Sequence, residues 1–583
     1  MTGPHTADLI LVNGDITPLA RARPAPSGAA TGRSAATGRS AVNGAGSAAG
    51  PGQVSALAVR SGRVQAIGTD DEVRRLAGAG TRVVDLAGRC VIPGLIDNHI
   101  HFVRAGLTWD AELRWERCPS LAAGLETVAE AAATRPAGEW VLVIGGWHER
   151  QFPEGRGPDR AELDRVAPQQ PVFVQMMYDW AQVNTAGMRA AGLTADLARA
   201  AGAHLFEWDE HGQLTGRVLG MEGCKWLYAR LPVPTLDQQI ASTARLSRDL
   251  NRFAVTSLID GGGVNTGPDV YEAVYEVDRR GELTVRTFLT VHASARGREP
   301  EEIAGYLRYG RRRHGSDTLR LLGFGEVVLY RLHDRVHTRV DVTDADLAEL
   351  TELFGRLAAG GWPMQMHAHR PEIIGTLLAA CEAVNARTPL APLRWGIVHG
   401  EMIEPDQIGR IRALGLGVLT QSLLRFLGDQ LIGAFGTERV RSAPPLRALL
   451  DAGVPLSAGT DAMRGASYDP FTSLHFYLTG RTIGGDTIVG EENLLTRAEA
   501  LDLYTRGSAW NCFAEDEIGA LLPGFRADLA VLSDDYFTVP EQRIPALESE
   551  LTLLGGRPVH LAGELAGELA GGALAEPDKQ EVR

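Results

Sequence analysis

Short apolar runs alternate with longer helical stretches through the middle of the chain. The runs predict eight strands, at residues 91–98, 253–260, 285–291, 319–329, 362–367, 393–399, 415–421 and 455–460. Strands that alternate with helices are typical of βαβ units and a parallel sheet. Eight of them predict an α/β fold with a closed (β/α)8 barrel of the TIM type over residues 91–512, whose functional residues lie at the carboxyl ends of the strands.

The two ends of the chain show short strands and turns instead of this alternation. Strands separated by an Asn13-Gly14 turn are predicted over 8–18, a hairpin at Ser61-Gly62 and a short helix near 70–78 follow, and short strands return after residue 513. We expect residues 1–90 and 513–583 to fold together as one small β-sandwich domain. Residues 20–54, which repeat Ala-Ala-Thr-Gly-Arg-Ser, predict a disordered insertion, and the repeated Leu-Ala-Gly-Glu of 561–568 predicts a loose tail.

A long segment, 105–250, separates the first two barrel strands and has helices and a hairpin-like turn of its own. An insertion on a β-to-α loop lies over the mouth of a barrel. We therefore expect this insertion to cover the substrate.

Composition narrows the choice of partners. The net charge of -14 and the lack of a basic run argue against nucleic acid or an anionic membrane as a partner, which leaves a small-molecule substrate. No apolar run reaches the ~20 residues of a membrane span, and the first residues lack the regions of a signal peptide. Five scattered cysteines without a CxxC pair fit a reducing compartment, so a soluble cytoplasmic protein is expected, and a homo-oligomer is compatible with the sequence.

The first barrel strand ends by presenting His99 and His101. Side chains alternate along a strand, so these two imidazoles project the same way and can bind one ion. Three further ligand-type residues close later apolar runs, namely His367, His399 and Asp461. Together they predict a catalytic divalent metal centre, with zinc as the first choice.

The order of these motifs resembles the amidohydrolase superfamily of metal-dependent hydrolases. His-x-His follows Pro93-Gly94-x-x-Asp97, and finer features such as Gly146-Trp147 and His367-Ala-His369 resemble the amidohydrolase-3 branch, which includes N-substituted formamide deformylases. The resemblance covers nearly the whole chain. It implies cleavage of a non-peptide C–N bond, of amide, N-formyl or N-acyl type, by metal-activated water, with Asp461 moving the proton to the leaving nitrogen.

Two departures from the family pattern bear on the site. Many relatives place a bridging carboxylated lysine at the end of the fourth strand, but the only lysines here are Lys225 and Lys579. Glu326 is the nearest carboxylate and is either a shorter bridge between two metal ions or an exposed barrel-end residue. The number of metal ions, one or two, therefore stays open. Trp180 stands where relatives carry a pocket histidine, which predicts an aromatic wall or, alternatively, core packing.

Other residues are weaker candidates. His369 is a candidate ligand, and His333 and His337 are candidates for proton transfer. Substrate contacts are predicted for His148, Gln421 and Arg425 in addition to Trp180. Two other functions stay open, a different reaction on the same metal site (ester or cyclic amide opening, or deamination) and a non-catalytic scaffold of amidohydrolase shape.

Overall fold

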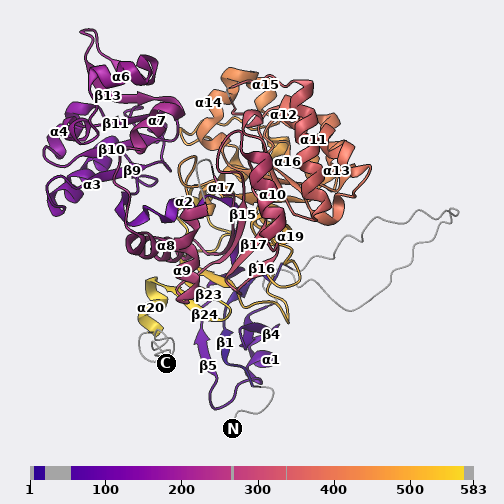
Figure 1. Cartoon of the computed structure of the whole chain (residues 1–583). Coiled ribbons are helices and arrows are strands. Elements are labelled where there is room, and N and C mark those ends of the chain that lie inside the picture. The colour runs from indigo at the N-terminus through magenta and orange to yellow at the C-terminus, as the bar shows by residue number, and fades with distance from the viewer. Residues whose placement is uncertain (1–5, 20–53, 264–267, 337, 570–583) are drawn as a thin grey trace.

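The computed structural model describes residues 6–19, 54–263, 268–336 and 338–569 (Figure 1). Residues 20–53, which hold nearly all of the predicted disordered insertion, lie outside these ranges, as does His337. Across the described residues, every helix is too short or too polar to cross a bilayer. The predicted loose tail is wrong over its first residues, because Gly563–Leu569 form helix α20.

Eight parallel strands form the centre of the molecule, in two groups of four. The first group runs β7–β14–β15–β17 and the second β18–β19–β20–β21. Their bounds are Leu95–Ile100 (β7), Val255–Asp260 (β14), Arg286–Val291 (β15), Leu319–Phe324 (β17), Gln365–Ala368 (β18), Gly396–His399 (β19), Gly417–Gln421 (β20) and Leu456–Gly459 (β21). Most of these strand residues are buried, since each parallel sheet carries helices on its outer face and packs on its inner face.

The fold is therefore an α/β fold of the TIM-barrel type, but the predicted closed barrel is only partly observed. Across the first seam, the described strands pair only at a single bridge between Phe324 and Met364. At the other seam, Asp461 donates its backbone N–H to the carbonyl of His99 at 2.8 Å, beyond the end of β21. No continuous ladder crosses either seam within the described residues.

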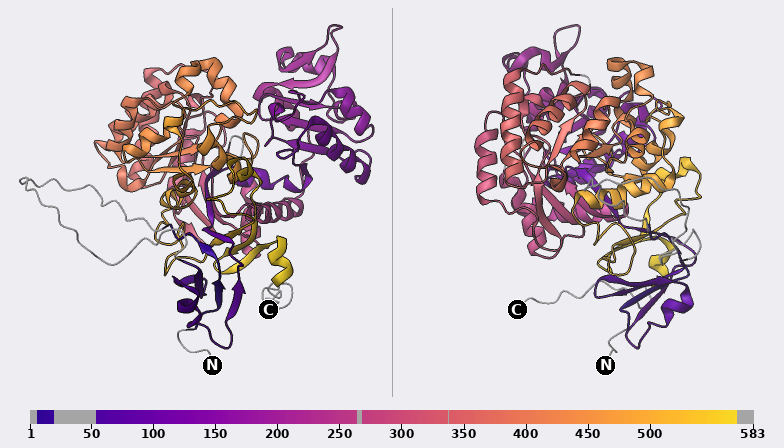
Figure 2. Two further views of the ribbon diagram at one scale, coloured as in Figure 1. Left: turned by 180° about the vertical axis from the view of Figure 1, so that it is seen from behind. Right: turned by 90° about the vertical axis from the view of Figure 1, so that its right-hand side faces the viewer.

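Helices cover the outside of the two strand groups (Figure 2). Amphipathic sequences place the apolar side of each helix against the strands, as in α11, where Leu350, Leu353 and Leu357 are buried. The covering helices are α8 (Leu236–Asn251), α9 (Glu272–Arg279), α10 (Glu299–Tyr309), α11 (Asp344–Ala359), α12 (Pro371–Asn385), α13 (Pro405–Leu414), α14 (Leu424–Phe435), α15 (Thr437–Val440), α16 (Leu446–Asp451), α17 (Pro470–Thr479), α18 (Arg497–Asp502) and α19 (Ser508–Asn511).

The segment between β7 and β14 begins with α2 (Phe102–Gly106) and then builds a separate sheet with its own helices, seen in purple in Figure 1. The sheet runs β12–β13–β11–β10–β9–β8. Its strands are β8 (Glu112–Leu113), β9 (Val141–Ile144), β10 (Val172–Met176), β11 (Trp180–Val183), β12 (Phe206–Trp208) and β13 (Leu214–Leu219). Helices α3 (Leu121–Thr134), α4 (Arg160–Val166), α5 (Thr185–Ala190), α6 (Ala195–Gly202) and α7 (Gly220–Tyr228) pack around it.

Strands from both chain ends share one sheet, in the order β2–β6–β22–β23–β24. The predicted run at 91–98 divides here, because β6 (Cys90–Pro93) joins this sheet whereas β7 joins the barrel. The other members are β2 (Asp15–Ile16), β22 (Leu529–Leu532), β23 (Ser549–Leu554) and β24 (Arg557–Leu561). A second sheet contains β1 (Leu9–Val12), β3 (Ala56–Arg60), β4 (Arg63–Gly68) and β5 (Arg82–Asp85), with α1 (Asp70–Arg74) beside it.

A buried ion pair ties these end strands to the barrel. Arg286, at the start of β15, donates from Nε to Asp528 Oδ2 at 2.7 Å and from Nη2 to Oδ1 at 3.0 Å. Both side chains are almost fully buried. Because a guanidinium and a carboxylate match in two parallel hydrogen bonds, this pair fixes the orientation of the C-terminal strands against the barrel.

Candidate metal centre

Six ligand-type side chains meet at the carboxyl ends of the barrel strands. His99 lies in β7, His367 in β18, and His399 is the last residue of β19. His101, Glu326 and Asp461 lie just beyond the ends of β7, β17 and β21. Parallel strands present their carboxyl ends to the same rim, so residues far apart in the sequence come together here.

Two of these residues hold an unusual backbone conformation. His399 has φ 73° and Asp461 has φ 57°, in the left-handed region that non-glycine residues seldom adopt. Such strain concentrates at functional sites, where the surrounding structure fixes it. Both side chains are thereby directed from the strand end into the rim.

Glu326 occupies the middle of the cluster. Its Oε2 lies 3.4 Å from His99 Nε2 and 3.3 Å from His367 Nδ1. The same oxygen is 3.9 Å from His399 Nε2, and Oε1 is 4.0 Å from His101 Nε2. Asp461 completes the set, with Oδ1 at 3.1 Å from His101 Nε2 and 3.8 Å from His99 Nε2. The single glutamate thus faces all four imidazoles, whereas Asp461 faces only two.

Hydrogen bonds on the far side of three rings, those of His99, His101 and His367, direct nitrogen lone pairs toward Glu326. His101 Nδ1 bonds the carbonyl of Gly262 at 2.9 Å, and a carbonyl accepts only, so Nδ1 carries the proton. His367 Nε2 bonds the carbonyl of Asp334 at 2.9 Å in the same way, which leaves Nδ1 as the free nitrogen. His99 Nδ1 bonds Gln365 Oε1 at 3.0 Å, which leaves Nε2 facing Glu326.

Lone pairs that converge on a carboxylate repel one another unless a positive charge lies between them. Neutral imidazole held by an outer hydrogen bond is the usual form of a histidine metal ligand. The donor set of imidazole nitrogens and carboxylate oxygens suits zinc and its first-row neighbours. The cluster therefore fits one or two divalent cations.

The electrostatics agree with this chemistry. Burial lowers the pKa of His99, but the hydrogen bond and charge of Glu326 outweigh burial and raise it to about 9. Burial raises the pKa of Glu326, but hydrogen bonds with His367 and His99 overcome that effect and hold it well below its usual range. Protons and metal cations compete for the same lone pairs, so a site that attracts protons this strongly also attracts cations.

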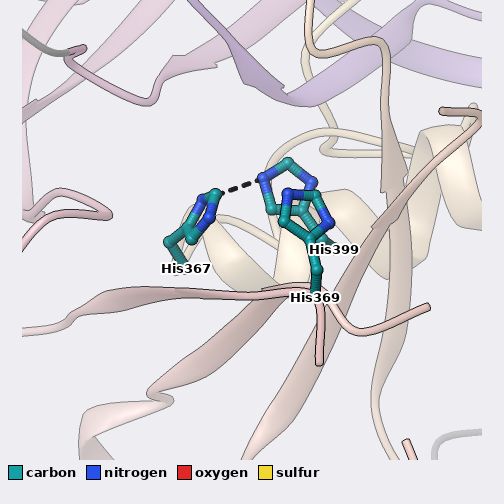
Figure 3. A group of neighbouring side chains, drawn as sticks. All are labelled: His367, His369 and His399. Carbon is teal, nitrogen blue, oxygen red and sulfur yellow. Dashed lines mark hydrogen bonds between the residues drawn. The ribbon is translucent and has the colours of Figure 1, made fainter. Parts of the chain in front are cut away.

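His369 lies beside the second half of the cluster. Figure 3 shows His367, His369 and His399 together, with the 3.1 Å contact between His399 Nε2 and His367 Nδ1 as a dashed line. The rings of His369 and His399 are stacked at 4.1 Å. His369 Nδ1 bonds Glu401 Oε2 at 2.8 Å, so its position next to the centre is fixed by this carboxylate.

Sequence reasoning missed three residues that hold histidines of the site, namely Gln365, Asp334 and Glu401. Gln365 lies two positions before His367 on the same strand face, so its spacing was a usable signal, whereas Glu401 lies in the turn after β19. Asp334 follows His333 in a loop, where periodicity gives no guide. His333 itself stacks on His367 at 3.8 Å.

A cavity of about 360 Å³ lies directly over the cluster. Its floor includes Glu326, His367 and Asp461, and the insertion contributes Tyr178 and Lys225 to its wall. The insertion therefore lines the mouth of the barrel. Lys225 lies at the cavity wall and forms an ion pair with Glu222 at 3.4 Å.

The four predicted substrate contacts lie outside the lining of this cavity. Trp180 packs in the insertion core, 5.9 Å from the ring of Trp147 and 4.5 Å from the guanidinium of Arg217. His148 is buried as the cap of a short turn and accepts from the backbone N–H of Arg150.

The other two predicted contacts belong to the barrel. Gln421 is fully buried and donates to the carbonyl of Leu419 in its own strand. Arg425 lines a different cavity of about 460 Å³. The aromatic wall expected from Trp180 is therefore not observed, because β11 directs this side chain into the sheet of the insertion.

The chain is similar in sequence and fold to known hydrolases. The model of the amidohydrolase family matches residues 82–560. The chain is 26% identical over 502 residues to N-substituted formamide deformylase of Arthrobacter pascens, covering 82% of this chain and 90% of that protein. It is 24% identical to the putative amidohydrolase YtcJ of Bacillus subtilis, covering 87% and 96%. An uncharacterized metal-dependent hydrolase from Pyrococcus horikoshii has a similar fold, with a TM-score of 0.63, 19% identity, and coverage of 92% of this chain and 99% of that one.

Proposed function

The chain belongs to the amidohydrolase family of hydrolases, and we propose that it cleaves a non-peptide carbon–nitrogen bond, of amide, N-formyl or N-acyl type, in a small molecule. The position of Glu326 among four imidazoles carries this proposal, because it completes a ligand set that lacks the bridging lysine. The similarity to a protein named N-substituted formamide deformylase supports the choice of bond.

The ligands divide into two overlapping groups. We propose that His99, His101 and Asp461 hold one divalent ion together with Glu326, and that Glu326, His367 and His399 hold a second. Zinc suits both groups because they offer only imidazole and carboxylate donors. A bound divalent ion supplies acidified water and polarises the carbonyl of the substrate.

Asp461 is the residue that moves the proton. Its side chain borders the cavity and lies against the ligand cluster, so its carboxylate can accept a proton from the attacking water and return it to the leaving nitrogen. His333 and His369 also border the cavity, beside His367. Insertion residues such as Tyr178 and Lys225 line one wall of the cavity, where they can contact the substrate.

We also propose a division of the chain that follows from the shared end sheets. Residues 1–90 and 513–583 form one small β domain, residues 91–512 form the hydrolase barrel, and 105–250 form the insertion over its mouth. This division predicts that isolated residues 91–512 lose stability, because the buried pair between Arg286 and Asp528 is then broken.

The test combines metal analysis with an assay on N-formyl and N-acyl amines. We expect purified protein from zinc-supplemented medium to contain about one or two ions per chain, and Asp461→Asn to lower kcat by a factor of ~10² or more. Asp196→Asn, a change on the exposed helix α6, is the matched control and should keep full activity. Metal-free protein, or full activity of Asp461→Asn, would contradict the proposal.

A further inference from the structure

The cavity over the ligand cluster shares a wall with a second cavity of about 360 Å³. Four residues line both spaces, namely Arg104, Tyr178, Lys225 and Arg464. Three of these four carry a positive charge, although the chain as a whole is strongly acidic. Lys225 already pairs with Glu222, so the two arginines are the cations of this wall that call for a negative partner.

Neither arginine of the wall forms an ion pair with another of the described residues. Arg104 donates from Nη2 to the hydroxyl of Tyr178 at 3.0 Å, and the guanidinium of Arg464 lies 4.2 Å from the ring centre of Tyr228. Among the described residues, no carboxylate oxygen lies within 4.0 Å of either guanidinium. Tyrosine contacts position both guanidinium groups, and the more distant Glu112 helps to raise the pKa of Arg464, but neither group has a carboxylate in direct contact.

This arrangement differs from that of other arginines in the protein. Arg286 and Arg117, for example, each contact two carboxylates. A guanidinium keeps its proton even when it is partly buried, and a contacting anion compensates its charge more fully than an aromatic ring does. Arg104 and Arg464 are both half-buried at the same cavity wall, which makes a bound anion the partner that fits them.

The second cavity beyond this wall is mainly apolar. Leu107, Leu142, Leu231, Val233 and Val270 contribute to its lining. A molecule that reaches from the ligand cluster past the wall therefore meets a metal-binding floor, then a cationic wall, and then an apolar space. Each zone selects a different group of the same molecule.

We propose that the substrate carries a carboxylate, bound by Arg104 and Arg464 with Lys225 nearby, and an apolar substituent that enters the second cavity. This rests on the proposed function, which places the scissile amide at the ligand cluster. The substrate class is then an N-acylated or N-formylated compound with a carboxylate and an apolar group. A planar carboxylate matches the two parallel N–H groups of a guanidinium, which favours it over a single neutral acceptor.

A matched pair of substrates tests the carboxylate directly. N-acetylphenylalanine, in both enantiomers, and N-acetylphenethylamine differ only by the carboxylate. We expect kcat/KM of the holoenzyme to be at least about tenfold higher for one enantiomer of the acid than for the amine. Arg464→Met and Arg104→Met should each raise KM for the acid roughly tenfold to a hundredfold and leave KM for the amine unchanged.

Two further variants separate a binding role from a folding role. Arg464→Lys keeps a charge and should recover part of the lost affinity, which a purely structural role would not produce. Arg356→Met, a change on the outer helix α11, is the control and should leave both substrates unaffected. Equal KM values for acid and amine in the wild type and in both Met variants would overturn the proposal.

A binding measurement distinguishes failure of this proposal from failure of the proposed function. 3-Phenylpropionate carries the carboxylate and the apolar group but no scissile bond. If neither amide is hydrolysed but the holoprotein binds 3-phenylpropionate, and Arg464→Met weakens this binding about tenfold or more, the anion site stands without the hydrolase function. If the amine is hydrolysed and 3-phenylpropionate does not bind, the hydrolase stands and the anion site is refuted. Binding of inorganic phosphate in preference to 3-phenylpropionate would also refute the carboxylate.

Discussion

Glu326→Gln is the substitution that tests the centre most directly. The change removes one negative charge and keeps the size and one acceptor oxygen of the side chain. In the structure this charge lies 3.3–3.4 Å from two imidazole nitrogens and 3.9–4.0 Å from two others, so a single residue serves both halves of the ligand set. We expect Glu326→Gln to weaken both halves together.

The size of the effect follows from the distances. Two unit charges about 4 Å apart attract by about 4 kcal/mol at an effective dielectric constant of ~20. A divalent ion doubles this attraction, and desolvation of the buried carboxylate removes a comparable share of the gain. About 4 kcal/mol therefore remains, which corresponds to roughly a thousandfold loss of metal affinity.

The assay is a competition between the protein and a fluorescent zinc chelator, followed by elemental analysis after dialysis. Glu299→Gln is a matched control, because Glu299 is a buried carboxylate that accepts from the backbone N–H of Tyr330 away from the centre. We expect the control to keep the wild-type metal content. If Glu326→Gln binds as many ions as the wild type, with a Kd within about tenfold, Glu326 is not a shared ligand and the proposed centre is wrong.

Three further substitutions test the surroundings of the site. His148→Asn keeps a cap acceptor but removes an imidazole whose pKa is lowered by burial to about 4. Because the pKa of the unfolded state is near 6.5, the buried neutral ring contributes up to about 3 kcal/mol to stability above pH 6.5, and this contribution is lost as the pH falls from about 6.5 to 4. The urea midpoints at pH 5 and 7.5 should therefore differ less in the variant than in the wild type. Trp180→Ala should lower the free energy of unfolding by about 3–5 kcal/mol while KM changes less than about twofold, and a large change in KM would return this residue to the substrate site. Arg286→Met leaves Asp528 buried without its partner and should destabilise the fold by about 3–5 kcal/mol in urea denaturation, and a loss below about 1 kcal/mol would show that the pair does not anchor the end strands.

The barrel strands and the ligand set were predictable because both depend on local patterns. Each predicted strand is a short apolar run, and His367 and His399 close their runs, so the polarity of a single position marks the rim. The order of motifs that is typical of the family then assigned these residues, which lie hundreds of positions apart, to one metal site. The division of 91–98 into β6 and β7 was not predictable in this way, since Gly94 interrupts a run that is apolar on both sides and only tertiary pairing separates the two strands.

The substrate cavity was much less predictable, because its wall comes from the tertiary arrangement of the insertion. Trp180 and Tyr178 are two positions apart, yet Trp180 packs into the insertion sheet whereas Tyr178 lines the cavity. The turn before β11 decides between these two directions, and it has no distinctive sequence. Lys225 reaches the cavity because helix α7 lies against it, which also depends on contacts distant in sequence.

The central position of Glu326 shows both the strength and the limit of reasoning by elimination. With only two lysines in the chain, the sequence already directed attention to the nearest carboxylate. Its reach, however, depends on how the backbone leaves β17 at Phe324. Gly325 allows the turn, since a Cβ there would meet Thr290 Oγ1 at 2.7 Å, and the chain therefore passes close to β15 before Glu326. A glutamate is shorter than a carboxylated lysine, so we expect the path of the backbone at Gly325 to decide whether the carboxylate of Glu326 reaches the four imidazoles. Gly325→Ala should therefore weaken metal binding although residue 325 is not itself a ligand, and unchanged metal affinity in a folded Gly325→Ala protein would show that the backbone path does not set the position of Glu326.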